Sequence, residues 1–351
     1  MPVPPPDRST TPLDPLEQDK GMIGVGNLAA EEGYLAGEDA DLLIRELESE
    51  EDLADGAGAA AKRKLGLAFW IAVGFLAVLT LMALLAPVLA PDDNSGVLPS
   101  PYEQPRGLNA TAEMSLPPLS TRLDGSLAVL GTDSLGRDQL SRIMWGARVS
   151  LGVGFASVGL GLLIGGVIGL TAGYFRGPLD SFFMAGMDIL LAFPALLLAL
   201  SIVAIRGKGP TNAIIALTIV SIPTIARLVR ANTLVFSQRE FVVAARTLGA
   251  SNGRVMGREV LPNVSVALLP FIPLGIAVAI AAEGALAYLG QSVEIPEASW
   301  GAMIAEGRPQ LDQGNWWVPM VPIAFLVITL VSLNLIGDRL REYFSIKEVG
   351  L

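Results

Sequence analysis

Residues 65–90 read LGLAFWIAVGFLAVLTLMALLAPVLA and contain no charged side chain. A helix needs about 20 predominantly apolar residues to cross a bilayer, so this stretch predicts a membrane-spanning helix. Five more apolar stretches follow it: 149–172, 182–205, 213–226, 264–289 and 316–336. Because backbone groups in lipid must hydrogen-bond to one another, all six are predicted to be helices. The sequence therefore predicts an all-α integral membrane protein with six transmembrane helices.

The composition excludes several kinds of chemistry. Among 351 residues, 52% are hydrophobic and 17% are charged, and there is no Cys and no His. Disulfides, Cys/His zinc sites and a Ser-His-Asp triad are therefore impossible. The chain also lacks the Gly-x-x-x-x-Gly-Lys-Ser/Thr pattern that binds nucleotide phosphates. We expect no enzyme activity, cofactor or metal in this chain itself.

The charge is unevenly distributed along the chain. Residues 1–61 carry 15 acidic and 3 basic side chains, whereas the other residues carry 19 acidic and 21 basic ones. The first segment is also rich in Pro and Gly, which predicts an acidic and largely disordered tail. The sequence contains no stripe of basic residues of the kind that would indicate a nucleic-acid partner.

Basic residues also predict the orientation in the membrane. Lys62, Arg63 and Lys64 directly precede the first span, and positive charge concentrates on the cytoplasmic side. Both termini are then cytoplasmic in a protein that crosses the membrane several times. Residues 91–148 form an extracytoplasmic loop, and residues 149–338 form a core domain with the other five spans.

The predicted second span carries Gly161, Gly165, Gly169 and Gly173, one at every fourth position. Small residues at this spacing share one helix face and allow a second helix to approach closely. The stripe predicts tight helix packing and does not by itself indicate what crosses the membrane.

Residues 239–263 predict a cytoplasmic helix–turn–helix. Phe241, Ala244, Ala245 and Leu248 follow the i, i+3, i+4, i+7 spacing of one apolar helix face. Gly249 stands where a left-handed residue ends a helix, and Ser251 stands where the next helix begins. Periodicity alone leaves open whether this face docks on a protein or rests on the lipid surface.

This segment resembles the EAA motif of ABC importer permeases: Ala244-Ala245, then Gly249, then a segment ending Leu261-Pro262. Three other stretches resemble the dipeptide/oligopeptide permease subfamily. They are Gly131-Thr132-Asp133 with Gly136-Arg137-Asp138, Ser299-Trp300-Gly301 with Met303, and Gly337-Asp338 with Leu340-Arg341. The four motifs lie in the family's order over about residues 62–342, and the chain is most similar to the "C" permease of such systems.

The resemblance implies a type I ABC importer permease fold, located in a bacterial cell (inner) membrane, that forms half of a peptide pathway. It implies four kinds of partner: a homologous second permease, two ABC ATPase domains that bind ATP and Mg, an extracytoplasmic peptide-binding protein and the lipid bilayer. The segment 239–263 would be the coupling loop to the ATPases, through Glu240, Phe241, Ala244, Ala245, Arg246, Leu248, Gly249 and Ser251. The chain departs from the family at Val243, where the first Glu of the motif usually stands, and Glu240 lies one turn earlier on a similar face.

Two polar features have competing interpretations. Glu283 lies deep in the fifth span, where it either lines the translocation path or makes a structural contact, with a proton relay as a third alternative. The acids and arginines of 131–148 indicate either a metal site or, as their pairing favours, a lattice of salt bridges. Nickel, opine and glycopeptide importers share the predicted architecture, and a proton-coupled carrier is a more distant alternative.

Overall fold

The computed structural model describes residues 65–90, 98–102, 104, 110–123, 125–294 and 296–349. The chain divides into two units, Met1–Lys64 and Leu65–Leu351, and only the second falls within these ranges. The predictions made for the acidic tail therefore lie outside the described residues.

Long apolar helices build the second unit. Five are long enough to cross a membrane without interruption: α3 (Gly66–Leu89), α4 (Gln139–Phe175), α7 (Pro210–Phe236), α11 (Phe271–Tyr288) and α13 (Trp317–Val349). A sixth span forms if α5 (Gly177–Leu191) and α6 (Ala195–Arg206), bent by 85° to one another, are counted as one. The six predicted spans therefore correspond to five continuous helices and one broken helix.

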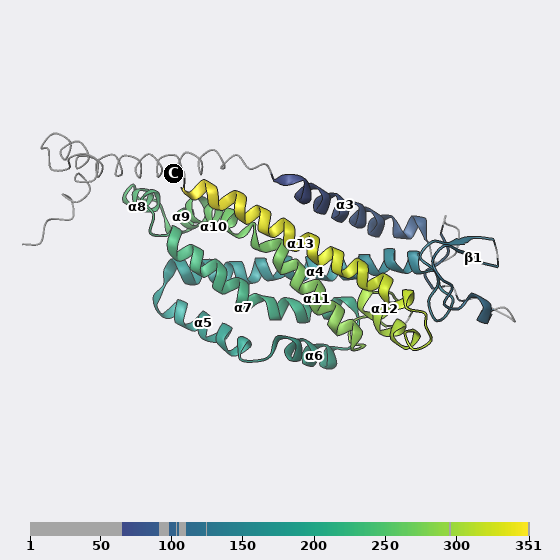
Figure 1. Cartoon of the computed structure of the whole chain (residues 1–351). Helices are drawn as coiled ribbons and strands as arrows, with labels where there is room; N and C mark the ends of the chain where they lie inside the picture. Colours follow the sequence, from purple (N-terminus) through teal and green to yellow (C-terminus); the bar gives the residue numbers. More distant parts are fainter. Residues whose placement is uncertain are drawn as a thin grey trace, which may run out of the picture. The chain divides into compact units, whose positions relative to one another are not determined.

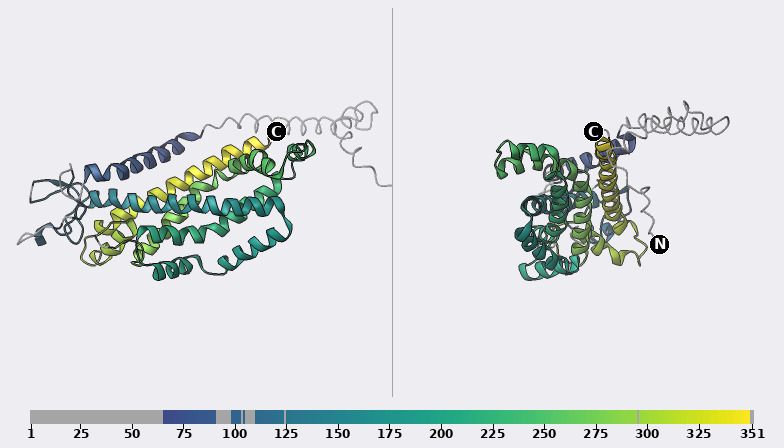
Figure 2. Two further views of the ribbon diagram at one scale, coloured as in Figure 1. Left: turned by 180° about the vertical axis from the view of Figure 1, so that it is seen from behind. Right: turned by 90° about the vertical axis from the view of Figure 1, so that its left-hand side faces the viewer.

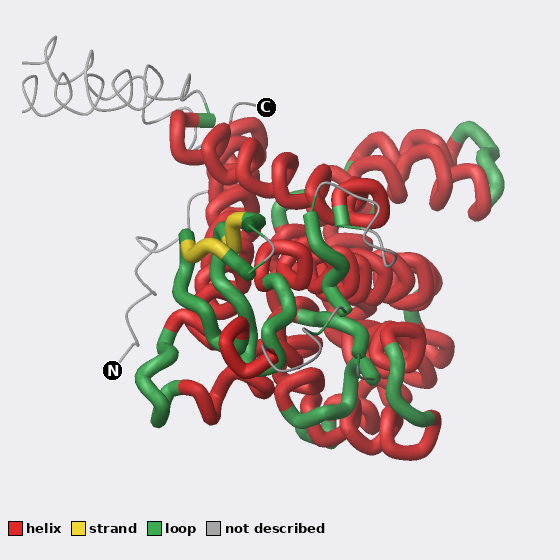
Figure 3. Tube along the Cα trace, turned by 90° about the vertical axis from the view of Figure 1, so that its right-hand side faces the viewer, coloured by secondary structure: helices red, strands yellow, loops and turns green. Residues whose placement is uncertain are grey.

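Shorter elements lie at the two ends of the bundle (Figure 1). One end carries α8 (Glu240–Thr247), α9 (Asn252–Val255), a π-turn (Met256–Val260) and α10 (Leu261–Leu268). The other end carries α12 (Trp300–Gly307), two 3-10 turns (Ala110–Glu113 and Arg308–Gln310) and the antiparallel strands β1 (Ser120–Thr121) and β2 (Leu127–Ala128), paired Ser120 to Ala128. Loops gather at this second end, which faces the viewer in Figure 3.

Several helix boundaries differ from the sequence prediction, and three of these differences have a clear local reason. Helix α4 begins at Gln139, ten residues before the predicted span, because Asp138 caps its first turn by accepting from the Ser141 amide at 2.8 Å. Pro194 interrupts the third span, since proline has no amide hydrogen and restricts the residue before it. Likewise the fifth span begins at Phe271, directly after Pro270, and α10 precedes it as a separate helix.

The glycine stripe of α4 packs against α7. A methyl group placed on Gly165 would lie 2.8 Å from the Ile222 carbonyl oxygen, and one on Gly169 would lie 2.3 Å from that of Ala226. Gly161 and Gly173 meet the same helix. In contrast, Gly166 on another face of α4 has open space around it. The predicted close approach of a second helix is thus confirmed, and α4 and α7 form the centre of the bundle.

Candidate functional site

The arm formed by α8, α9 and the π-turn projects from the side of the bundle at one end (Figure 2). Val242 anchors this arm, because it is fully buried and packs in an apolar cluster with Val255, Val260 and Val264. The Arg246 guanidinium also stacks over the Tyr174 ring of α4 at 4.8 Å. The hydroxyl of the same tyrosine bonds to Asn252 Oδ1 at 3.1 Å. The arm therefore has a fixed position relative to α4.

The turn between α8 and α9 has the predicted geometry. Gly249 adopts a left-handed conformation with φ of 82°, which favours glycine. Its amide donates to the Arg246 carbonyl at 2.9 Å, and the Ala250 amide donates to the Ala245 carbonyl at 3.1 Å, so the last carbonyls of α8 are satisfied. Ser251 stands at the N-cap position of α9 with extended backbone, although its side chain makes no capping bond.

The outward face of α8 differs from the predicted apolar face. Phe241, Ala244 and Leu248 are exposed as expected, with Leu248 at 88%. Ala245, however, turns partly inward against the Val242 cluster. A shallow groove on the outside is lined by Gln238, Glu240, Val243, Ala244, Thr247 and Leu248. All five residues from 241 to 245 are apolar, and charged residues flank them at 240 and 246. The sequence therefore permits more than one face of α8 to be buried. Tertiary packing selects the face that buries Val242.

The residues of the family loop motif lie together at the opposite end of the bundle. Gly131 and Gly136 both adopt positive φ, and a methyl group on Gly131 would lie 2.4 Å from the Leu116 carbonyl oxygen. Thr132 Oγ1 donates to the Glu113 carbonyl at 2.6 Å and accepts from the Leu116 amide at 2.8 Å. The motif thereby fixes the loop that precedes α4.

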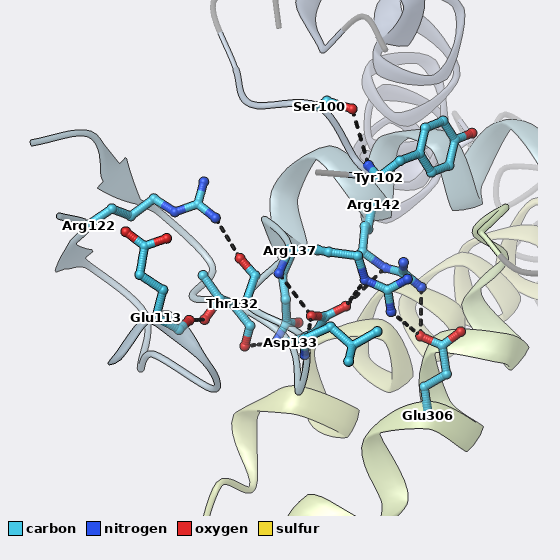
Figure 4. A network of polar contacts seen from close by, with 12 residues as sticks. Ser100, Tyr102, Glu113, Arg122, Thr132, Asp133, Arg137, Arg142 and Glu306 are labelled. Carbon is cyan, nitrogen blue, oxygen red and sulfur yellow. Dashed lines mark hydrogen bonds and ion pairs between the residues drawn. The ribbon is translucent and has the colours of Figure 1, made fainter. Parts of the chain in front are cut away.

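Charged side chains in this loop form a buried network (Figure 4). Arg137 Nε lies 2.7 Å from Asp133 Oδ2, and Arg137 Nη2 lies 2.5 Å from Glu306 Oε2. Arg142 Nη2 also contacts Glu306 Oε2, at 2.9 Å. Both arginines have side chains only 1% exposed. This geometry favours the salt-bridge interpretation of the motif over the metal site.

Glu306 was not singled out by the sequence, because it lies far along the chain in α12 and belongs to no local motif. Asp138 is the other buried acid of this loop. Burial raises the pKa of its carboxyl above the ordinary value, and hydrogen bonds from Ser141 together with the charge of Arg122 act in the opposite direction.

Glu283 is fully buried within α11. Its carboxylate accepts from the hydroxyls of Ser150 on α4 and Ser292 in the loop after α11, both at 2.8 Å. The Ser292 carbonyl in turn accepts from the Gly209 amide, which precedes α7, at 2.6 Å. These contacts favour the structural role that the sequence left open, and a role in the translocation path stays a prediction.

The comparisons with known proteins agree with this architecture. Residues 165–347 match the family described as binding-protein-dependent transport system inner membrane component. The di/tripeptide transport system permease protein DppC of Pseudomonas aeruginosa is 40% identical over 270 residues, which cover 76% of this chain and 84% of that protein. This chain belongs to that family of membrane permease components, as its motifs predicted, and is a non-enzymatic multi-pass subunit of an ABC importer.

Other relatives carry related descriptions. The glutathione transport system permease protein GsiD of Pectobacterium atrosepticum is 41% identical over 213 residues, which cover 61% of this chain and 70% of that protein. The dipeptide transport system permease protein DppC of Alkalihalophilus pseudofirmus is 40% identical over 225 residues, which cover 64% and 74%. Among solved structures, the inward-facing MetNI methionine ABC transporter is similar at 20% identity, with a TM-score of 0.48 over 58% of this chain and 96% of that chain.

Proposed function

We propose that this chain is a permease subunit of an ATP-driven importer of dipeptides and short oligopeptides. The exposed groove on α8 is the main support for the proposal. The arm is anchored to the bundle, yet it presents apolar residues that no other part of the described chain covers. An ATPase subunit would receive the arm, and ATP with Mg would be bound there and not in this chain. A homologous second permease would complete the pathway.

The cargo assignment is supported by the di/tripeptide and dipeptide permeases among the relatives. Glutathione is the second candidate, supported by the relatives with that description. Since glutathione is itself a tripeptide, both candidates belong to one chemical class. An extracytoplasmic peptide-binding protein would deliver either of them.

The orientation follows from the same proposal. The arm must lie in the cytoplasm to reach an ATPase, and both termini lie on that side after an even number of crossings. The β1–β2 hairpin, the charged network and α12 then lie on the extracytoplasmic side, where a binding protein docks.

Ala244→Arg in the reconstituted complex tests the coupling role. An arginine at this position would be buried without a partner when the ATPase docks, which costs about 3–5 kcal/mol. We expect peptide-stimulated ATP hydrolysis to fall more than tenfold. Ser181→Arg is the matched control, because it places the same side chain at an exposed position of α5 near this end. Stimulation at the wild-type level in Ala244→Arg would return α8 to the lipid-surface interpretation.

A further inference from the structure

Two arginine–aspartate pairs join α7 to α5, and they differ in exposure. Arg230 binds Asp180 through two contacts, Nε to Oδ1 at 2.5 Å and Nη2 to Oδ2 at 2.6 Å, with side chains 33% and 15% exposed. Arg227 binds Asp188 through a single contact, and these side chains are 52% and 61% exposed. The first pair is bidentate and partly buried, and we call it the covered pair. The second has a single contact and is exposed, and we call it the open pair.

The open pair lies within two helices of the membrane-spanning bundle, Asp188 in α5 and Arg227 in α7. At 1.5 Å per residue, Asp188 is about 17 Å along α5 from Gly177, and Arg227 is about 14 Å from the end of α7 at Phe236. A charged side chain at the centre of a membrane helix costs about 2.5–3.5 kcal/mol when it faces lipid. The face of α5 and α7 that bears this pair therefore meets water or protein in the assembled transporter.

The helices that carry the pair also line an apolar cavity of about 370 Å³, although neither Arg227 nor Asp188 is among its lining residues. Thr224 and Leu228 of α7, on either side of Arg227 in the sequence, line this cavity, and so does Leu191, one turn after Asp188. Most other lining residues are aliphatic and come from α4 and α11, for example Val158 and Val278. The cavity thus has apolar walls on the same two helices that carry the cation and the anion.

We propose that Arg227 and Asp188 bind the carboxylate and the ammonium of a short zwitterionic peptide during its passage, with the apolar cavity receiving its side chains. The inference rests on the peptide cargo proposed above. Charge complementarity supports it, because the pair presents one charge of each sign to the two charged ends of one ligand. An exposed ion pair stabilises a protein by only about 0–1 kcal/mol, so cargo can replace each partner at little cost.

The test measures peptide imported per ATP hydrolysed by the complete complex in liposomes, with a radiolabelled dipeptide that has free termini. We expect R227Q and D188N each to lower this ratio about tenfold. R230Q and D180N, which alter the covered pair, are the matched controls. They should lower thermal stability and leave the ratio of imported peptide to hydrolysed ATP at the wild-type level. The charge swap R227D/D188R separates the roles further, since it restores a purely structural pair and should leave the ratio low.

Each alternative result of this experiment would contradict one specific part of the proposal. Wild-type ratios in R227Q and D188N, or full recovery in the swap, would show that the pair only bridges α5 and α7. Loss of the second permease from both variants would show that the pair lies in a subunit interface. A wild-type complex that imports no dipeptide would overturn the peptide cargo and this inference together, whereas import unaffected by the variants would overturn this inference alone.

Discussion

Gly249 sets the direction in which the arm formed by α8, α9 and the π-turn changes course. Its φ of 82° is uncommon for residues with a side chain, yet a methyl group at this position would meet no other atom. Any cost of substitution therefore comes from the backbone conformation and not from crowding. This distinguishes it from Gly131, where the Leu116 carbonyl also blocks a side chain.

Gly249→Ala should loosen the arm by about 1–2 kcal/mol, the cost of a left-handed conformation for an L-residue. We expect faster trypsin cleavage at the neighbouring Arg246 and Arg254, measured in detergent solution. Gly253→Ala is the matched control, because Gly253 lies in α9 with an ordinary φ and open surroundings. Equal cleavage rates in the two variants would contradict the role given to the turn.

Glu306 neutralises two buried arginines from a single carboxylate. Glu306→Gln leaves Asp133 as the remaining acid of that network, and breaking a buried pair costs about 3–5 kcal/mol. We place the loss near 3 kcal/mol because the Glu306 side chain is 25% exposed. The expected result is a lower melting temperature of the purified complex. Glu297→Gln, an exposed acid at the same end, should melt like the wild type.

At the scale of elements, sequence patterns correctly predicted those features that depend on interactions between neighbouring residues. The apolar runs, the glycine stripe and the end of α8 depend on residues within a few positions of one another, and all appear in the structure. The ion pair of Arg137 with Glu306 and the inward position of Ala245 depend on packing between segments that are distant in the sequence. No periodicity in the sequence encodes those contacts, so Glu306 and the selected face of α8 required the structure.

The α4–α7 contact should respond to a single methyl group. Gly169→Ala places it 2.3 Å from a backbone oxygen that cannot rotate away, and overpacking typically costs about 1–3 kcal/mol. Gly166→Ala adds the same group in open space on the same helix. We expect a lower melting temperature only in Gly169→Ala. If both variants melted alike, the helices would be able to separate at little cost.

At the scale of the whole molecule, the two ends of the bundle have different constructions. One presents an anchored apolar arm, and the other a loop layer built around buried charge. The broken span α5–α6 lies between them and carries the open ion pair. This polarity agrees with the proposed assignment of ATPase docking to one end and binding-protein docking to the other.

The proposed orientation can be tested with introduced thiols, because the chain has no cysteine. Leu123, 62% exposed near the β1–β2 hairpin, and Thr247, exposed on α8, lie at opposite ends. A membrane-impermeant maleimide should label the Leu123→Cys variant in right-side-out vesicles and the Thr247→Cys variant only in inside-out vesicles. The reverse pattern would invert the topology and remove the basis for the coupling proposal.

The charged network also has a consequence for the order of synthesis. Arg137 and Arg142 leave the ribosome 169 and 164 residues before Glu306. At typical elongation rates of 5–20 residues per second, they wait about 8–34 seconds for this carboxylate. During that interval Asp133 is the one acid of this network that is available to pair with them. A nascent chain that stalls before α12 therefore lacks the carboxylate that contacts both buried arginines.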